Sequence, residues 1–167
     1  PLDSEHFSIY QYLINNQNLY LKNLTITASG GPFLGKKFST LKNVSFKQAS
    51  KHPKWKMGYK NSIDSATLCN KCLEIIEAHY LFNIPFNKLD IIIHPESKIH
   101  SIFEFQNYIY NYIAFQNDMT IPIFHFLNQK FKYELNKKNF NLDKNNKFIF
   151  EKVKLNQFPI YKLFNQL

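Results

Sequence analysis

Polar side chains recur at helical spacing along residues 64–77, whose sequence is DSATLCNKCLEIIE. Asn70, Glu74 and Glu77 stand at positions i, i+4 and i+7, which share one face of an α-helix, and Lys71 lies beside them. The opposite face is expected to be an apolar stripe that packs on a core and consists of Cys69, Cys72, Leu73, Ile76 and Tyr80. The pattern therefore predicts a helix that presents a row of chemically useful groups.

The start of this helix and a distant turn could together bind a phosphate group. Asp64 or Ser65 is the expected N-cap, where free backbone N–H groups and the positive end of the helix dipole attract anions. Ser29, at a Gly-Gly turn, adds a hydroxyl, while Asn70 and Lys71 add an amide and a cation. Turn formation, helix capping and an ordinary solvated helix face would explain the same residues.

Carboxylates from two separate elements could hold a divalent cation. Asp3 and Glu5 stand on one short segment, and Glu74 supplies a third carboxylate from the helix. Mg²⁺ and Mn²⁺ prefer such hard oxygen ligands, with water or substrate oxygens completing an octahedron. An acidic pair at a helix start can also serve only to stabilise the helix dipole.

The elements that must position these groups predict one α+β domain with a mixed β-sheet flanked by helices. A first helix should follow the acidic pair, because apolar residues recur at helical spacing from Phe7 to Ile14. A short apolar helix should begin near Pro122. Strands are expected at residues 24–28, 89–94, 101–105, 108–115 and 148–150. The four glycines all lie between residues 30 and 58, so this stretch is the candidate mobile lid.

Composition excludes several classes of protein. The 167 residues are 44% hydrophobic and 17% aromatic, which is typical of a globular domain with a real core. No apolar run approaches the roughly 20 residues needed to cross a bilayer. The net charge of +9 comes from 21 basic residues, all lysine, and the absence of arginine argues against sequence-specific nucleic-acid binding. A positive field would still recruit a phosphorylated substrate.

The two cysteines, Cys69 and Cys72, form a single CxxC pair on the predicted core-facing side of the helix. Without a second pair, this spacing is weak support for zinc or redox chemistry, and free cysteine behaves as a small hydrophobic residue. We therefore expect buried thiols in a reducing compartment.

Five blocks of the sequence, in order, resemble the 1-deoxy-D-xylulose 5-phosphate reductoisomerase family. The blocks are residues 3–6 (DSEH), 29–33 (SGGPF), 52–58 (HPKWKMG), 64–77 and 94–101 (HPESKIHS). Agreement of several multi-residue blocks in one order is a stronger signal than any single short motif. The resemblance implies a metal-assisted rearrangement followed by NADPH-dependent reduction to 2-C-methyl-D-erythritol 4-phosphate, a step of the non-mevalonate isoprenoid pathway.

The resemblance also implies roles for individual residues. The metal ligands for Mg²⁺ or Mn²⁺ would be Asp3, Glu5 and Glu74. The catalytic residues would be Glu5, Glu74 and His52. The substrate-binding residues would be Ser4, Glu5, Ser29, His52, Trp55, Ser65, Asn70, Lys71 and Glu74. NADPH would be contacted by Met57, Gly58 and Met119, and a flexible flap at about residues 48–60 would close over the substrate.

No G-x-G-x-x-G dinucleotide fingerprint occurs in the 167 residues. The resemblance therefore implies a catalytic-domain fragment that lacks the upstream Rossmann-type NADPH domain and the downstream helical domain, and that is inactive alone. Residues 1–128 would be the catalytic, metal- and substrate-binding domain, and 129–167 a linker towards the helical domain. The sequence departs from the family pattern at Tyr59, Cys72, Glu96 and Thr120.

The expected partner is a phosphorylated sugar, with no nucleic acid and no membrane, and the full-length protein would be a homodimer. A cytoplasmic location follows from the reduced thiols, with a plastid-type organelle as the alternative. The alternative function is a non-catalytic, lysine-rich, anion-binding remnant of such an enzyme. Generic nucleic-acid binding that falls steeply with salt would distinguish that alternative.

Overall fold

A mixed five-stranded sheet, in the order β4-β3-β1-β2-β5, organises the molecule. The computed structural model describes residues 1–16, 20–55, 58–128, 134, 147–164 and 166. The strands are β1 (Leu21–Ala28), β2 (Leu89–Ile93), β3 (Ile99–Phe105), β4 (Tyr110–Ala114) and β5 (Glu151–Lys152). β1 and β2 run parallel, and every other neighbouring pair is antiparallel. The expected α+β class and mixed sheet are confirmed.

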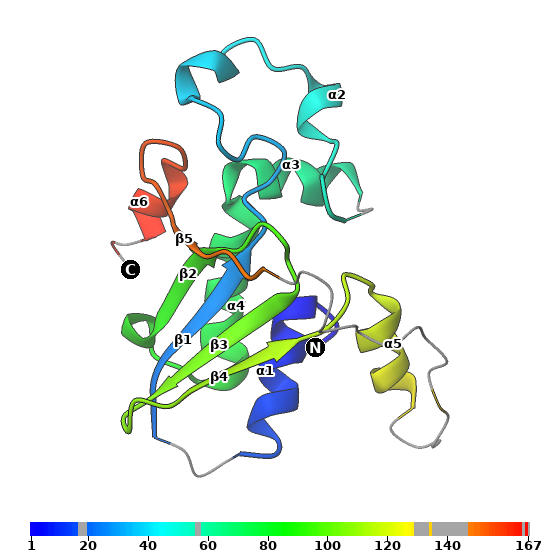
Figure 1. The fold of residues 1–167 in the computed structure, drawn as a ribbon, viewed down its shortest axis with the longest axis vertical. Coiled ribbons are helices and arrows are strands. Elements are labelled where there is room, and N and C mark those ends of the chain that lie inside the picture. Colours follow the sequence, from blue (N-terminus) through cyan, green and yellow to red (C-terminus); the bar gives the residue numbers. More distant parts are fainter. Residues whose placement is uncertain (17–19, 56–57, 129–133, 135–146, 165, 167) are drawn as a thin grey trace.

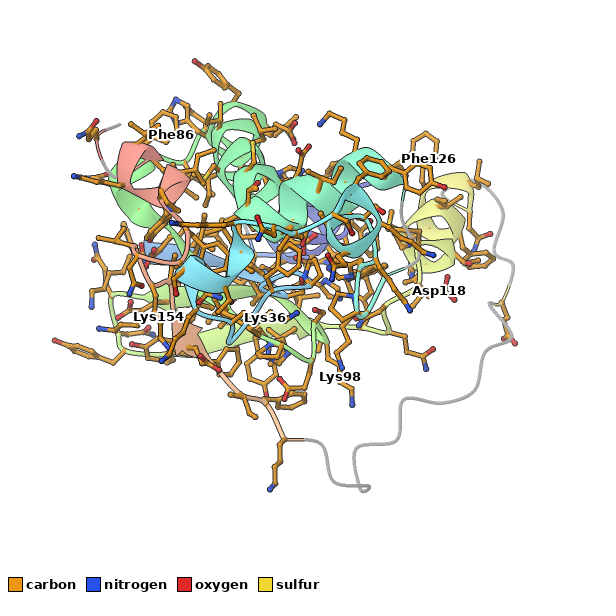
Figure 2. All side chains as sticks on the ribbon, turned by 90° about the horizontal axis from the view of Figure 1, so that it is seen from above. Lys36, Phe86, Lys98, Asp118, Phe126 and Lys154 are labelled. Carbon is orange, nitrogen blue, oxygen red and sulfur yellow. The ribbon has the colours of Figure 1, made fainter. Side chains whose placement is uncertain are left out.

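Helices cover one face of this sheet and extend beyond one end of it (Figure 1). They are α1 (Ser4–Leu13), α2 (Phe46–Ala49), α3 (Tyr59–Thr67), α4 (Cys69–Phe82), α5 (Thr120–Leu127) and α6 (Ile160–Phe164), with 3₁₀ turns at Phe38–Leu41 and Phe86–Lys88. α1 and α4 contact each other and the sheet, so they share one face, as the view along the sheet shows (Figure 2). None of the described helices combines the length and the apolar character of a membrane span.

The core lies between the sheet and these two helices. β1 contributes Leu24, Ile26 and Ala28, whose alternate positions place their side chains on the covered face. Ile9 of α1 and Ile75 of α4 are completely buried against them. This packing fixes the N-terminus of α1 and the first turns of α4 near the end of β1.

The polar helix expected over residues 64–77 is two helices, so that prediction was wrong in its outline. α3 ends and α4 begins at Leu68, which adopts the left-handed conformation with φ of 67°. A left-handed residue costs about 1–2 kcal/mol. Leu68 is 1% exposed, and burying a leucine contributes about 1.5–3 kcal/mol, which offsets that cost. Ser65 therefore lies in the last turn of α3 and is not an N-cap.

The expected apolar stripe of α4 was also wrong. Leu73 is 44% exposed and Tyr80 is 77% exposed, although both were assigned to the core. The buried residues of this helix are Cys72, Glu74, Ile75 and Ala78. Compared with the expected orientation, α4 is rotated about its axis, so that the face containing Glu74 is turned towards α1. Burial of the Cys72 thiol is confirmed, whereas Cys69 is only half-buried.

The segment after residue 146 returns to the sheet. The strand expected at residues 148–150 is absent there, and the two-residue β5 pairs with Ile92 and Ile93 instead. Phe158 is 2% exposed in the core, and α6 contacts α4. Residues 129–133 and 135–146 lie outside the described residues, so the boundary drawn at residue 128 stays a prediction. The described part of the segment completes the core.

Candidate active site

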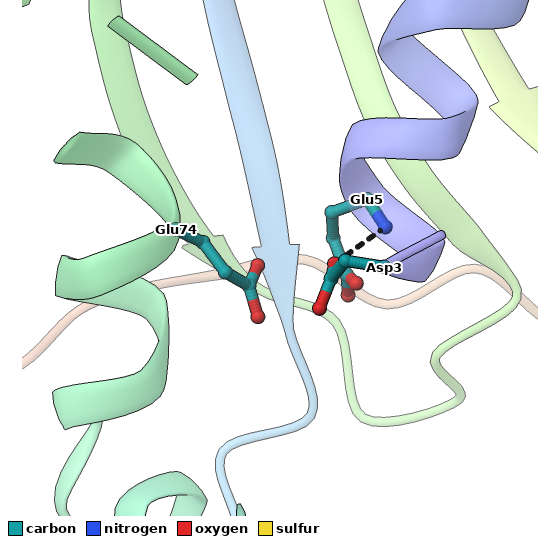
Figure 3. Close-up of side chains that lie close together, drawn as sticks. All are labelled: Asp3, Glu5 and Glu74. Atoms are coloured by element: carbon teal, nitrogen blue, oxygen red, sulfur yellow. Dashed lines mark hydrogen bonds between the residues drawn. The ribbon is translucent and has the colours of Figure 1, made fainter. Parts of the chain in front are cut away.

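Three carboxylates meet where α1 and α4 face each other beside the end of β1 (Figure 3). Asp3 is the N-cap of α1 and its Oδ1 accepts the backbone N–H of Glu5 at 3.1 Å. Glu5 stands in the first turn of α1, and Glu74 approaches from α4. One ligand oxygen from each residue lies within 4.8 Å of the other two. Glu5 and Glu74 are buried, which is unusual for carboxylates unless they are paired.

The ammonium group of Lys71 is bonded to this carboxylate cluster. Its Nζ donates to Glu5 Oε1 at 2.6 Å and to Glu74 at 2.7 Å (Oε2) and 2.9 Å (Oε1). Asn70 donates its Nδ2–H to the same Oε1 of Glu74. The lysine side chain is 12% exposed, so these interactions are largely shielded from water. One ammonium thus faces three carboxyl groups.

Burial and the neighbouring charges shift the pKa values of the carboxyl groups in different directions. Burial, reinforced by the nearby Glu5 carboxylate, raises the pKa of Asp3 to about 6. Burial and then the charge of Glu5 also raise the pKa of Glu74 well above its ordinary value. Burial opposes ionisation of Glu5 too, but Lys71 and nearby His100 outweigh it and lower its pKa. The cluster is therefore short of positive charge.

A divalent cation would supply the positive charge that the carboxylate cluster lacks. The donors are carboxylate oxygens, which Mg²⁺ and Mn²⁺ favour, and they converge from two elements on one small volume. Open coordination positions would be left for water or substrate, because only three side chains contribute. The donor set thus fits a catalytic cation of this class.

Hydroxyl groups gather on the other side of the cleft. Ser29 directly follows β1, and its Oγ lies 3.4 Å from Ser65 Oγ on α3. The turn after Ser29 needs glycine, since Gly31 has φ of 69° and its N–H donates to Ser29 Oγ at 3.2 Å. A Cβ at Gly31 would stand 2.6 Å from the carbonyl oxygen of Ser65. This close backbone approach brings the two serines together.

His52 joins the serines in a defined tautomer. Its Nδ1 accepts the backbone N–H groups of Lys54 at 3.1 Å and Trp55 at 2.8 Å. The neutral ring therefore carries its hydrogen on Nε2, which lies 2.8 Å from Ser29 Oγ and donates to it. Burial, followed by the positive charge of Lys71, lowers the pKa of His52, which favours this neutral form.

The carboxylate cluster and the hydroxyl groups line one cleft with a volume of about 270 Å³. Of the residues named from the sequence, the cleft brings together Asp3, Ser4, Glu5, Ser29, His52, Trp55, Gly58, Ser65, Asn70, Lys71, Glu74 and Met119. Met57 lies outside the described residues, as does part of the expected flap. The flap's mobility stays a prediction.

Sequence reasoning missed other lining residues, namely Thr27, Asn61 and Ser97. Thr27 could have been found, because it lies on β1 two residues before Ser29, and alternate residues of an extended chain point to the same side. Ser97 stands in the 94–101 block. Asn61 carried no signal, since its helix was not expected.

None of the four departures from the family pattern lines the cleft, and Cys72 lies in the core. Tyr59 is 69% exposed at the start of α3, and Thr120 is the first residue of α5. Glu96 Oε2 accepts the N–H of Ile149 at 3.3 Å and lies 3.2 Å from His94 Nδ1. None of these side chains displaces a group of the carboxylate cluster.

Comparison with known proteins gives a consistent result. Residues 1–82 match the family described as the 1-deoxy-D-xylulose 5-phosphate reductoisomerase C-terminal domain. The 1-deoxy-D-xylulose 5-phosphate reductoisomerase of Pelagibacter ubique is 42% identical over 167 residues, covering 100% of this chain and 43% of the relative. That of Lawsonia intracellularis is 44% identical over 163 residues, covering 98% and 40%.

Solved structures agree over nearly the whole chain. A DOX-P reductoisomerase in complex with NADPH, fosmidomycin and magnesium has a TM-score of 0.89 and 36% identity, covering 99% of this chain and 43% of its own. The enzyme from Zymomonas mobilis in complex with NADPH has a TM-score of 0.83 and 35% identity, covering 99% and 42%. The chain thus spans about two-fifths of the length of these relatives.

Proposed function

Because the chain belongs to the 1-deoxy-D-xylulose 5-phosphate reductoisomerase family, we propose that it forms the catalytic core of such an enzyme. The whole enzyme would rearrange 1-deoxy-D-xylulose 5-phosphate and reduce the product with NADPH to 2-C-methyl-D-erythritol 4-phosphate in isoprenoid biosynthesis. The observation that carries this proposal is the single cleft that holds both a carboxylate cluster and a set of phosphate-binding donors.

Asp3, Glu5 and Glu74 would hold the divalent cation. Magnesium is bound in three similar solved structures of DOX-P reductoisomerase, and we extend it to this chain on the donor set alone. When bound, the cation would act as a Lewis acid on the substrate's carbonyl and hydroxyl oxygens. Glu5 and Glu74 would thereby touch the reacting part of the substrate through their bound cation.

The substrate phosphate would lie at the hydroxyl side of the cleft. Ser29 and Ser65 offer hydroxyl donors there, and the Nε2–H of His52 positions the Ser29 hydroxyl. Ser4, Asn70 and Lys71 line the same cleft and donate hydrogen bonds to the carboxylates of Glu5 and Glu74. Trp55 would cover the carbon chain of the substrate and exclude water.

NADPH would approach the cleft near Gly58 and Met119, which both line it. Met57 was assigned to the same contact and lies outside the described residues. Because no dinucleotide fingerprint occurs in the 167 residues, the cofactor would be bound mainly by another domain. The 167-residue chain alone would therefore not catalyse the reaction.

Several further features belong to this proposal. The site-bearing part would be residues 1–128, with the flap over about 48–60. We also propose a homodimer and a cytoplasmic location for the whole protein. Support for dimerisation is limited to β4, an edge strand of the sheet, on which Tyr110 and Tyr112 are more than half exposed.

Removal of one proposed ligand tests the metal site. Glu74→Gln keeps the shape of the side chain but loses the carboxylate, so Mn²⁺ affinity, measured calorimetrically on the 167-residue chain, should fall by at least roughly tenfold. Glu77→Gln is the matched control, since Glu77 follows Glu74 by about one turn of α4 and its side chain is 59% exposed. Equal Mn²⁺ affinity in the wild-type and Glu74→Gln chains would refute the assignment.

A further inference from the structure

Lys71 has no hydrogen left for a phosphate group in this arrangement. An ammonium group has three N–H donors. All three are accounted for by the oxygens of Glu5 and Glu74, at 2.6, 2.7 and 2.9 Å. The residue proposed as the cationic phosphate ligand is therefore held entirely by the proposed metal ligands.

A divalent cation and this ammonium need the same oxygens. A cation bound by Glu5 and Glu74 would occupy the space beside the oxygens that now accept from Lys71. Two positive groups in one partly buried space would also repel each other strongly. Lys71 must therefore leave the carboxylates when the cation enters.

The cleft offers one destination for the released ammonium. Lys71 lines the same cleft as Ser29, His52 and Ser65, and its four-carbon stem allows its head group to swing. Among the described residues that line the cleft, Lys71 is the only lysine, and His52 is held neutral by its two N–H donors. A phosphate bound beside the serines would thus depend on Lys71 for its opposing charge.

We propose that Lys71 is a displaceable counter-ion that couples the two halves of the site. It neutralises the carboxylates when no divalent cation is bound, leaves when one binds, and then pairs with the phosphate group of the substrate. Cation and phosphate therefore bind cooperatively, and each strengthens the other by the same factor. This inference rests on the proposed function, because it assumes that the carboxylates are a cation site.

The test uses the 167-residue chain, Mn²⁺ and methylphosphonate as probes, and calorimetry. In the wild-type chain, saturating Mn²⁺ should tighten methylphosphonate binding at least about fivefold. Lys71→Met should bind Mn²⁺ several-fold more tightly than the wild-type chain, because the competing ammonium is gone, and should lose most of the fivefold enhancement. Lys22→Met is the matched control, since Lys22 also pairs with a glutamate at 2.7 Å but lies near the far end of β1 from Ser29.

A second measurement needs no substitution. Acetylation of lysines by acetic anhydride, quantified by peptide mass spectrometry, should be slow at Lys71 in the metal-free chain and faster once Mn²⁺ is bound. Methylphosphonate added with Mn²⁺ should slow it again, while acetylation of Lys22 should not change. Failure of Mn²⁺ to alter the rate at Lys71 would overturn the inference, whatever Lys71→Met does.

The outcomes separate this inference from the proposed function. If the wild-type chain binds Mn²⁺ but Lys71→Met binds it equally or more weakly, the ammonium is not a competitor and only the inference fails. Undiminished enhancement in Lys71→Met also overturns the inference alone. If neither chain binds Mn²⁺, the carboxylates are not a cation site and both proposals fail.

Discussion

At the scale of single residues, the candidate site gathers more carboxyl groups than one ammonium can neutralise. Three carboxyl groups gather around one ammonium, and burial, followed by the charge of Glu5, raises the pKa values of Asp3 and Glu74. Buried charges of one sign destabilise a fold unless they are paired. Such a cluster is therefore better explained by cation binding than by the stability of the domain.

His52 allows a pH test of the turn that carries Trp55. Its pKa is lowered from the ordinary 6.5, chiefly by burial, so the turn is stabilised at neutral pH and loses that stabilisation as pH falls through the lowered pKa. Protonation of Nδ1 would break both N–H bonds from Lys54 and Trp55. The emission of Trp55, the only tryptophan, should shift to the red with a midpoint below pH 6.5.

His52→Asn provides the control for this titration. An asparagine Oδ1 can accept the same backbone N–H groups but does not titrate, so the red shift should disappear while the turn is kept. An identical pH-dependent shift in the variant would show that another group, and not His52, governs the environment of Trp55.

At the scale of elements, the central strands were predictable and the helix boundaries near the site were not. Runs of β-branched and apolar residues located β1, β2 and β3 with their ends correct to within one residue, although β1 and β3 begin three and two residues earlier than expected. The break between α3 and α4 is at Leu68, and no glycine or proline marks it in the sequence. It depends on burial of the Leu68 side chain, which occurs only in the folded chain. The residues of the cleft were found by their order in family blocks, despite the wrong helix around them.

The glycine turn after β1 is the element whose geometry joins the two serines. Gly31→Ala should lower the free energy of unfolding by roughly 2–5 kcal/mol, since it adds a strained φ and a clash with the backbone of Ser65 and Ala66. Gly35→Ala is matched in φ, at 78°, but meets nothing within 4 Å, so about 1–2 kcal/mol is expected. Urea unfolding measures both values. Equal losses would show that the close approach at Gly31 is unimportant.

At the scale of the whole molecule, the site lies where the ends of one strand and several helices meet. The carboxyl end of β1, the N-terminus of α1 and the junction of α3 and α4 each contribute one part of the cleft. Ligands commonly bind beyond the carboxyl ends of parallel strands, and β1 and β2 are the parallel pair here.

The final segment of the chain contributes to the stability of the whole fold. Phe158→Ala should lower the free energy of unfolding by about 3–5 kcal/mol, because the phenyl ring is 2% exposed in the core. Leu163→Ala, at a side chain that is 65% exposed on α6, should change it by less than about 0.5 kcal/mol. Chemical denaturation distinguishes the two, and a loss below about 1 kcal/mol for Phe158→Ala would mean that this segment does not complete the core.

Asp3, Glu5 and Glu74 are proposed to hold one catalytic divalent cation together. Anomalous diffraction at the manganese edge, from crystals of the chain grown with Mn²⁺, would locate that cation directly. We expect one strong peak at roughly 2.0–2.6 Å from an oxygen of each of the three carboxylates, with the Lys71 ammonium moved away from them. A fully occupied manganese peak elsewhere, with Lys71 still bonded to Glu5 and Glu74, would contradict it.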